Sequence, residues 1–171
     1  RLMAGSANEE AVSNTATSEK ECYPDAAAIA EHVLQIRKDL PRTFPTHQEV
    51  ADKNELIEEV LIQYAARDPE VGYCQGMNFP ASVLVVAEQD LENASEHFQT
   101  LLLSVRGLWL PGFPLLEVGK HAFQVLFAER LPRLAAHFQD LSVADEMFLL
   151  DAWLTLFARW LPFGPSLSSA L

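Results

Sequence analysis

The sequence predicts an all-α fold, and three observations support this prediction. Apolar residues recur at helical spacing from residue 25 onward, proline or glycine marks several of the breaks between periodic segments, and no two segments alternate like paired strands. We therefore expect about seven helices packed around one core, in a multi-helix domain.

The first two helices are predicted from their apolar stripes. One is expected over residues 25–39, with a polar N-cap at its start. Pro41 and Pro45 then disfavour helical backbone, so residues 40–46 are predicted to form a loop with two stiff points. Residues 52–67 place their apolar side chains on one stripe and their glutamates elsewhere, which indicates an amphipathic helix.

The remaining helices are predicted with less amphipathic patterns. Residues 75–86 are almost wholly apolar and indicate a buried helix, although their β-branched residues leave a central strand as the alternative. Further helices are expected over residues 94–105, 115–130, 131–138 and 143–161. The side chains expected to fill most of the core in this half are Pro114, Phe98, Phe123, Phe127, Phe138, Phe148 and Phe157.

The charge of the chain excludes one class of partner. The sequence holds 24 acidic and 12 basic residues, which gives a formal net charge of -12. Such a chain repels phosphate backbones, so we expect no binding to nucleic acid. The longest apolar stretch, residues 148–163, contains Asp151 and Arg159 and is shorter than the roughly 20 residues of a spanning helix, so no transmembrane segment is expected.

The ends and the cysteines suggest a cytoplasmic protein. Residues 1–22 are mostly small and polar and are expected to form a flexible tail, as are residues 166–171 at the other end. Cys22 and Cys74 lie far apart and make no disulfide framework, which favours a reducing compartment.

Three kinds of chemistry find no support in the residue spacing. The five histidines lack the spacing of a zinc site, and Gly112 with Gly119 and Lys120 does not match a phosphate-binding loop. Cys74 has no histidine near it in sequence to activate it as a nucleophile. We therefore expect no metal or nucleotide cofactor bound by this chain.

Two short segments carry most of the functional information, residues 36–45 (IRKDLPRTFP) and 72–79 (GYCQGMNF). Arg42 is expected just past a helix end in a proline-braced loop, where its guanidinium can project toward another molecule. Gln75 is expected near the first turn of a buried helix, where a neutral amide can orient a water. The alternatives are that Arg42 only pairs with Asp39 and that Gln75 only satisfies a buried backbone group.

Together the two segments resemble the I-x-x-D-x-x-R-T-F-P and Y-x-Q-G-x-N signatures of the TBC family of Rab GTPase-activating proteins. The resemblance continues through residues 110–113 and 131–134 to residues 148–162, and covers about residues 23–165. It implies an all-helical, V-shaped TBC domain. Because the family's earlier motif and its later R-x-W-D segment have no match, we expect the domain to be incomplete at both ends.

The resemblance also implies a mechanism. Arg42 is expected to act as an arginine finger and Gln75 as a glutamine finger in the active site of a Rab-family small GTPase, which itself binds the GTP and magnesium. The chain would then be cytoplasmic and peripheral on endomembranes through its Rab partner. The residues expected to support the fingers or to bind the partner are Ile36, Asp39, Thr43, Phe44, Tyr73, Gly76 and Asn78.

Two other interpretations remain open from the sequence. The chain can be a non-catalytic module that binds GTPases or scaffolds a complex in membrane trafficking, or a fragment without independent function. The two motifs do not distinguish one Rab from another.

Overall fold

A computed structural model describes residues 26–162 and confirms the all-α prediction. This part of the chain forms eight α-helices and two short 3-10 turns, with no strand among the described residues. The strand alternative for residues 75–86 is therefore wrong. The tails expected at residues 1–22 and 166–171, and the N-cap expected at Asp25, lie outside the described residues.

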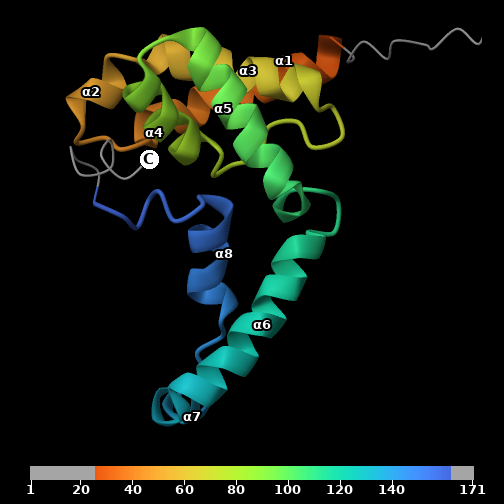
Figure 1. Cartoon of the computed structure of the whole chain (residues 1–171), viewed down its shortest axis with the longest axis vertical. Coiled ribbons are helices and arrows are strands. Elements are labelled where there is room, and N and C mark those ends of the chain that lie inside the picture. Colours follow the sequence, from red (N-terminus) through yellow and green to blue (C-terminus); the bar gives the residue numbers. More distant parts are fainter. Residues whose placement is uncertain (1–25, 163–171) are drawn as a thin grey trace, which may run out of the picture.

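The helices form a bundle and an arm (Figure 1). The arm leaves the bundle along α6, reaches α7 at its far end and returns along α8, so that bundle and arm enclose a V. No helix of the described residues is long and apolar enough to cross a membrane. The bundle consists of α1 (Ala26–Asp39), the 3-10 turn η1 (Leu40–Arg42), α2 (Gln48–Ala51), α3 (Asn54–Arg67), α4 (Asn78–Glu88) and α5 (Leu91–Ser104). The arm consists of α6 (Pro114–Arg130), α7 (Pro132–Asp140) and α8 (Glu146–Leu154), and a second 3-10 turn, η2 (Arg106–Leu108), precedes it.

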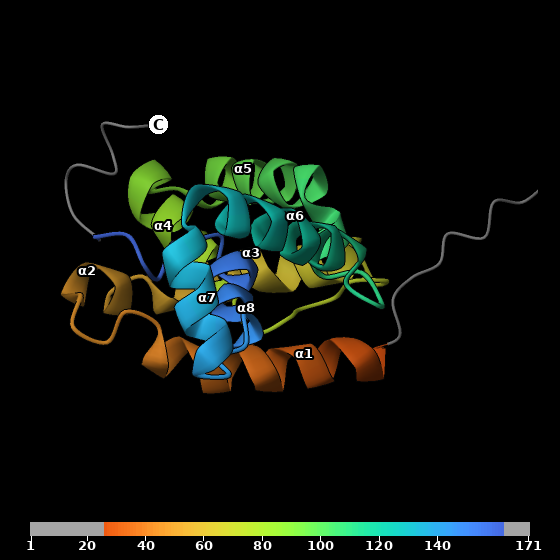
Figure 2. The ribbon, with the colours of Figure 1, turned by 90° about the horizontal axis from the view of Figure 1, so that it is seen from below.

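The core lies around α3, which Figure 2 shows between α1 and α5. The predicted stripe of α3 is buried, including Ile57, Val60 and Tyr64, and Tyr64 meets the ring of Phe98 edge-on at 5.5 Å. Because α3 contacts α1, α4 and α5, its stripe holds both segments of the candidate site on one support.

The expectation that Pro114 and the phenylalanines fill this core is wrong except for Phe98, which is fully buried. Pro114 and Phe157 are exposed to solvent. The four remaining rings meet one another at centroid distances of 5.1 to 6.1 Å and form a separate, half-buried cluster in the arm, made of Phe123, Phe127, Phe138 and Phe148. Periodicity identified their helices correctly but could not place the arm away from the bundle.

Helix α8 is shorter than the predicted span of residues 143–161. The backbone takes positive φ angles at Leu156 (49°) and Phe157 (60°), and the Phe157 N–H bonds the Ala152 carbonyl at 2.7 Å. The Thr155 hydroxyl donates to the Asp151 carbonyl at 2.7 Å. No proline or glycine marks this end in the sequence, so the local pattern gave no stop signal there.

A bidentate ion pair joins the end of α3 to the turn η2, from which the arm departs. The Arg106 guanidinium donates to both carboxylate oxygens of Asp68, at 2.6 and 2.7 Å, and to Glu70 at 2.7 Å. The Tyr64 hydroxyl also donates to Asp68, at 3.3 Å. Hydrogen bonding from Arg106 lowers the pKa of the Asp68 carboxyl from its ordinary value, despite partial burial that acts in the opposite direction.

We predict that Arg106→Ala lowers the free energy of unfolding at pH 7 by about 1–3 kcal/mol, since it leaves the largely buried Asp68 carboxylate without its cation. A depressed carboxyl pKa stabilises the fold above the unfolded value of about 3.9, and this contribution is lost as pH falls through the lower folded pKa. The difference between wild type and variant in urea unfolding should therefore shrink in acid.

The matched control is Arg37→Ala, which removes an arginine that pairs with Glu58 at 2.8 Å in a much more exposed setting. It should cost less than about 1 kcal/mol. Equal losses for the two variants would contradict a structural role for Arg106.

Candidate functional site

The first site segment, the arginine loop, comprises residues 40–46 and begins where α1 ends. Pro41 has no N–H, so the helix tightens into η1, and the Thr43 N–H bonds the Leu40 carbonyl at 3.0 Å. In a regular α-helix the Thr43 N–H would donate to the Asp39 carbonyl. Here the Thr43 hydroxyl donates to that carbonyl instead, at 2.8 Å. The predicted loop is thus partly a 3-10 turn, and its geometry is held by a side chain.

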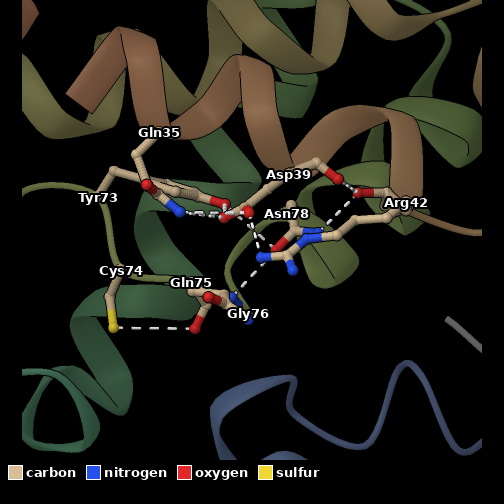
Figure 3. Close-up of polar contacts among 9 residues, drawn as sticks. Gln35, Asp39, Arg42, Tyr73, Cys74, Gln75, Gly76 and Asn78 are labelled. Carbon is tan, nitrogen blue, oxygen red and sulfur yellow. Dashed lines mark hydrogen bonds and ion pairs between the residues drawn. The ribbon is translucent and has the colours of Figure 1, made fainter. Parts of the chain in front are cut away.

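Arg42 lies at the end of this turn and is both exposed and paired. Its side chain is 57% exposed, and its guanidinium bonds the carboxylate of Asp39. The outward position and the pairing with Asp39 were predicted as alternatives, and the structure contains both. Figure 3 shows the guanidinium directed toward the segment that carries Gln75 and Gly76.

The second site segment, the glutamine loop, comprises residues 72–77 and is seated on α1. Gly72 has a φ of 62°, and a Cβ there would lie 2.3 Å from Nε2 of His32. The Tyr73 N–H donates to Nδ1 of the same histidine at 3.3 Å. The absence of a side chain at Gly72 therefore lets the loop approach α1 closely.

Gln75 lies at the exposed tip of this loop. Helix α4 begins at Asn78, so Gln75 precedes the helix by a turn and is not within it as predicted. Within the described residues the Gln75 side-chain amide has no hydrogen-bond partner, and the Gly76 N–H is occupied by Asn78 at 3.0 Å. The alternative that the Gln75 amide satisfies a buried backbone group therefore finds no contact here.

The Asp39 carboxylate is the polar centre between the two loops (Figure 3). It is 0% exposed and accepts hydrogen bonds from the Tyr73 hydroxyl at 2.7 Å, from the Gln35 amide at 3.3 Å and from Arg42. A buried carboxylate is costly unless several donors satisfy it. Asp39 therefore joins the arginine of one loop to the tyrosine of the other.

Asn78 makes a second connection between the loops. Its amide donates to the Thr43 hydroxyl at 2.6 Å, and its carbonyl oxygen accepts from the Gly76 N–H at 3.0 Å. The Tyr73 hydroxyl lies 3.3 Å from the same oxygen. Because Asn78 is almost fully buried, both of its polar ends depend on these partners.

Burial and the charge of Asp39 determine the protonation of the neighbouring side chains. Burial, with the hydrogen bond to Asp39 as the second cause, raises the pKa of Tyr73 far above its usual value. The hydroxyl therefore stays a donor at all physiological pH values. Burial first and Asp39 second also raise the pKa of the Cys74 thiol, which disfavours the thiolate form that a nucleophile requires.

Aromatic contacts support the loops from below. Phe44, with a positive φ of 45°, meets Phe79 edge-on at 5.1 Å and His47 at 5.7 Å. Ile36 is fully buried and belongs to the core. Phe79 lies in the first turn of α4, so the arginine loop rests on the helix that follows the glutamine loop.

The structure thus brings the predicted site residues together, and three of them belong to the hydrophobic core: Ile36, Phe44 and Tyr73. Three contributors were not predicted: His32, Gln35 and Phe79. His32 and Gln35 lie seven and four residues before Asp39, so helical spacing placed them on its face of α1, but nothing in the sequence indicated that the glutamine loop would dock there.

The chain is similar in sequence to known proteins. A family model described as the Rab-GTPase-TBC domain matches residues 2–168. The chain is 33% identical over 159 residues to GTPase-activating protein GYP5 of Eremothecium gossypii, which covers 90% of the chain and 19% of that protein. It is 33% identical over 150 residues to human TBC1 domain family member 14, and this match covers 80% of the chain and 20% of the relative. The chain therefore spans about a fifth of the length of these curated relatives.

Gly76 supplies a test of how tightly the glutamine loop is packed. Its φ is 113°, and a Cβ there would lie 2.7 Å from the Leu154 carbonyl oxygen at the end of α8. Gly112 also has a positive φ, 81°, but a Cβ there meets nothing within 4 Å. We predict that Gly76→Ala lowers the free energy of unfolding by at least about 1 kcal/mol more than Gly112→Ala, measured by urea unfolding. Equal losses would mean that α8 does not pack on the loop.

Proposed function

Since this chain belongs to the Rab-GTPase-TBC domain family, we propose that it acts as a GTPase-activating protein for a Rab-family GTPase. Arg42 and Gln75 enter the active site of the partner, which holds the GTP and magnesium. The observation that supports this proposal best is the buried network of Asp39, Tyr73, Thr43 and Asn78, which braces two exposed polar side chains from separate loops.

Arg42 has the chemistry that the hydrolysis step requires. In the transition state, negative charge is spread over the phosphoryl oxygens, and a guanidinium placed there stabilises it. Arg42 already exposes more than half of its side chain, and the buried Asp39 carboxylate holds it at the base of the loop. The carboxylate limits the conformations of the arginine before binding, which reduces the entropy that complex formation must overcome.

Gln75 is suited to position the attacking water. Its amide is exposed, lacks an intramolecular partner among the described residues, and offers one acceptor and two donors on a short side chain. The backbone around it is fixed by Tyr73 on one side and by the Asn78 contact to Gly76 on the other. In this proposal Gln75 substitutes for a water-orienting residue of the GTPase.

The same proposal gives the remaining motif residues supporting roles. Asp39, Thr43, Tyr73 and Asn78 are largely buried, so they position the fingers and do not reach a partner. Phe44 stabilises the arginine loop through Phe79. Recruitment by a Rab would place the chain peripherally on endomembranes, in vesicle trafficking.

We predict that Arg42→Ala reduces the acceleration of phosphate release from a responsive GTP-loaded Rab by about 10³-fold or more, and that Arg42→Lys restores little of it, because an ammonium cannot donate in the forked geometry of guanidinium. Arg37→Ala, which removes an exposed arginine of α1, is the matched control and should retain wild-type activity. Full activity in Arg42→Ala would contradict the arginine assignment.

We predict that Gln75→Ala also abolishes most of the acceleration, because water positioning is lost, while the Rab still binds. Gln48→Ala, an exposed glutamine at the start of α2, is its control and should be active. Binding of a GTP-loaded Rab by the wild-type chain without any rate increase would favour a non-catalytic binding or scaffolding module.

A further inference from the structure

The end of α8 lies against the glutamine loop, and the segment that follows it, residues 155–161, contacts the start of α4. At the end of α8, the Leu154 carbonyl packs so closely on Gly76 that no Cβ fits between them. Further along, the Arg159 guanidinium lies over the Phe79 ring, 5.6 Å from its centroid. Figure 3 shows this part of the chain passing below Gln75 and Gly76, on the side away from Tyr73. The segment therefore begins next to the glutamine loop and contacts the first turn of the helix that follows it.

This surface is apolar and open to solvent. Phe157, Trp160 and Leu161 are 47%, 53% and 50% exposed. Large exposed apolar patches often mark protein interaction sites. Tryptophan and arginine are also the residues that most often dominate binding energy in protein interfaces.

The segment is held in place before any partner binds. One carboxylate, that of Asp151 on α8, accepts from Arg159 at 2.7 Å and from the Trp160 indole N–H at 2.9 Å. The backbone is turned by the Phe157 N–H bond to Ala152 and by the Thr155 hydroxyl bond to the Asp151 carbonyl. Fixed side chains lose little entropy on binding, so the exposed indole is suited to be an anchor.

Two loop tips alone cannot hold a GTPase. A stable protein interface buries about 800 Å² on each partner, contributed by some 20–30 residues. Around the fingers, Asp39, Thr43 and Phe44 are buried and contribute little contact area. Surface beyond the two loops must therefore supply binding energy, and the segment after α8 is next to the glutamine loop.

We propose that residues 157–161 form a second contact surface for the same GTPase, with Trp160 as its anchor. This inference rests on the proposed function. In it the two loops supply the chemistry, while the segment after α8 supplies affinity that is the same in the ground and transition states. Such uniform binding appears in KM and not in kcat.

The experiment compares Trp160→Ala with wild type, using the Rab that responds most strongly to the wild-type chain in a panel of GTP-loaded Rabs. We expect KM for the GTPase to rise about tenfold or more while kcat stays within about twofold. Leu103→Ala is the matched control, since Leu103 is an exposed apolar residue on α5 beside Arg106, and should change neither constant.

Leu161→Asp is the second variant, because it places a charge on the exposed surface without removing a contact to Asp151; it should also raise KM. Thermal melts establish that each variant is folded. Unchanged KM in both folded variants overturns the proposal. The proposal is also overturned if the wild-type chain sediments as a dimer and the variants sediment as monomers, because the surface is then a self-association face. A wild-type chain that accelerates no Rab refutes the proposed function. In that case, binding of the wild-type chain and the variants to Rabs loaded with a non-hydrolysable GTP analogue still tests the surface. A wild-type chain that binds none of these Rabs overturns both the proposed function and the proposed contact surface.

Discussion

The buried carboxylate of Asp39 is the interaction on which the rest of the site depends. With no access to water, it must be satisfied by protein donors, and these come from α1, from the arginine loop and from the glutamine loop. Satisfying this one group therefore fixes the relative positions of two separate loops, whose residues Arg42 and Tyr73 are 31 positions apart in sequence. Asn78 repeats this connection through neutral hydrogen bonds, so the loops are braced at two points.

The helices of the bundle could be predicted because local rules and packing agree there. Apolar stripes predicted the ends of α1 and α3 to within about two residues. The apolar faces of these helices that periodicity identified are the ones buried in the structure. Local rules failed at α8, which ends beside Gly76 without a proline or glycine stop residue of its own. They also failed for the aromatic residues of the arm, because a pattern identifies an apolar face but not the element that covers it. The short α2 was missed, as four residues carry little periodicity.

The candidate site was predictable in its residues but not in its connections. The two motifs identified Arg42, Gln75 and their neighbours, and helix geometry suggested the Asp39 pairing. No local feature indicated that Tyr73 would reach Asp39, that Asn78 would bond Thr43, or that His32 would seat the glutamine loop. These are contacts between residues 34 to 41 positions apart, and they follow from tertiary packing. The same packing brings Arg159 over the Phe79 ring of α4, where the sequence suggested only a long helix.

The central claim is that one rigid, cross-braced site presents an arginine and a glutamine to the transition state of GTP hydrolysis in another protein. A site of this kind binds the transition state more tightly than the ground state. The most direct measurement is the affinity of the chain for a responsive Rab loaded with GDP, with and without aluminium fluoride, which mimics the transferring phosphoryl group. The account predicts a marked gain in affinity with aluminium fluoride for wild type and a loss of that gain in both Arg42→Ala and Gln75→Ala. An equal gain in wild type and in both variants would contradict it.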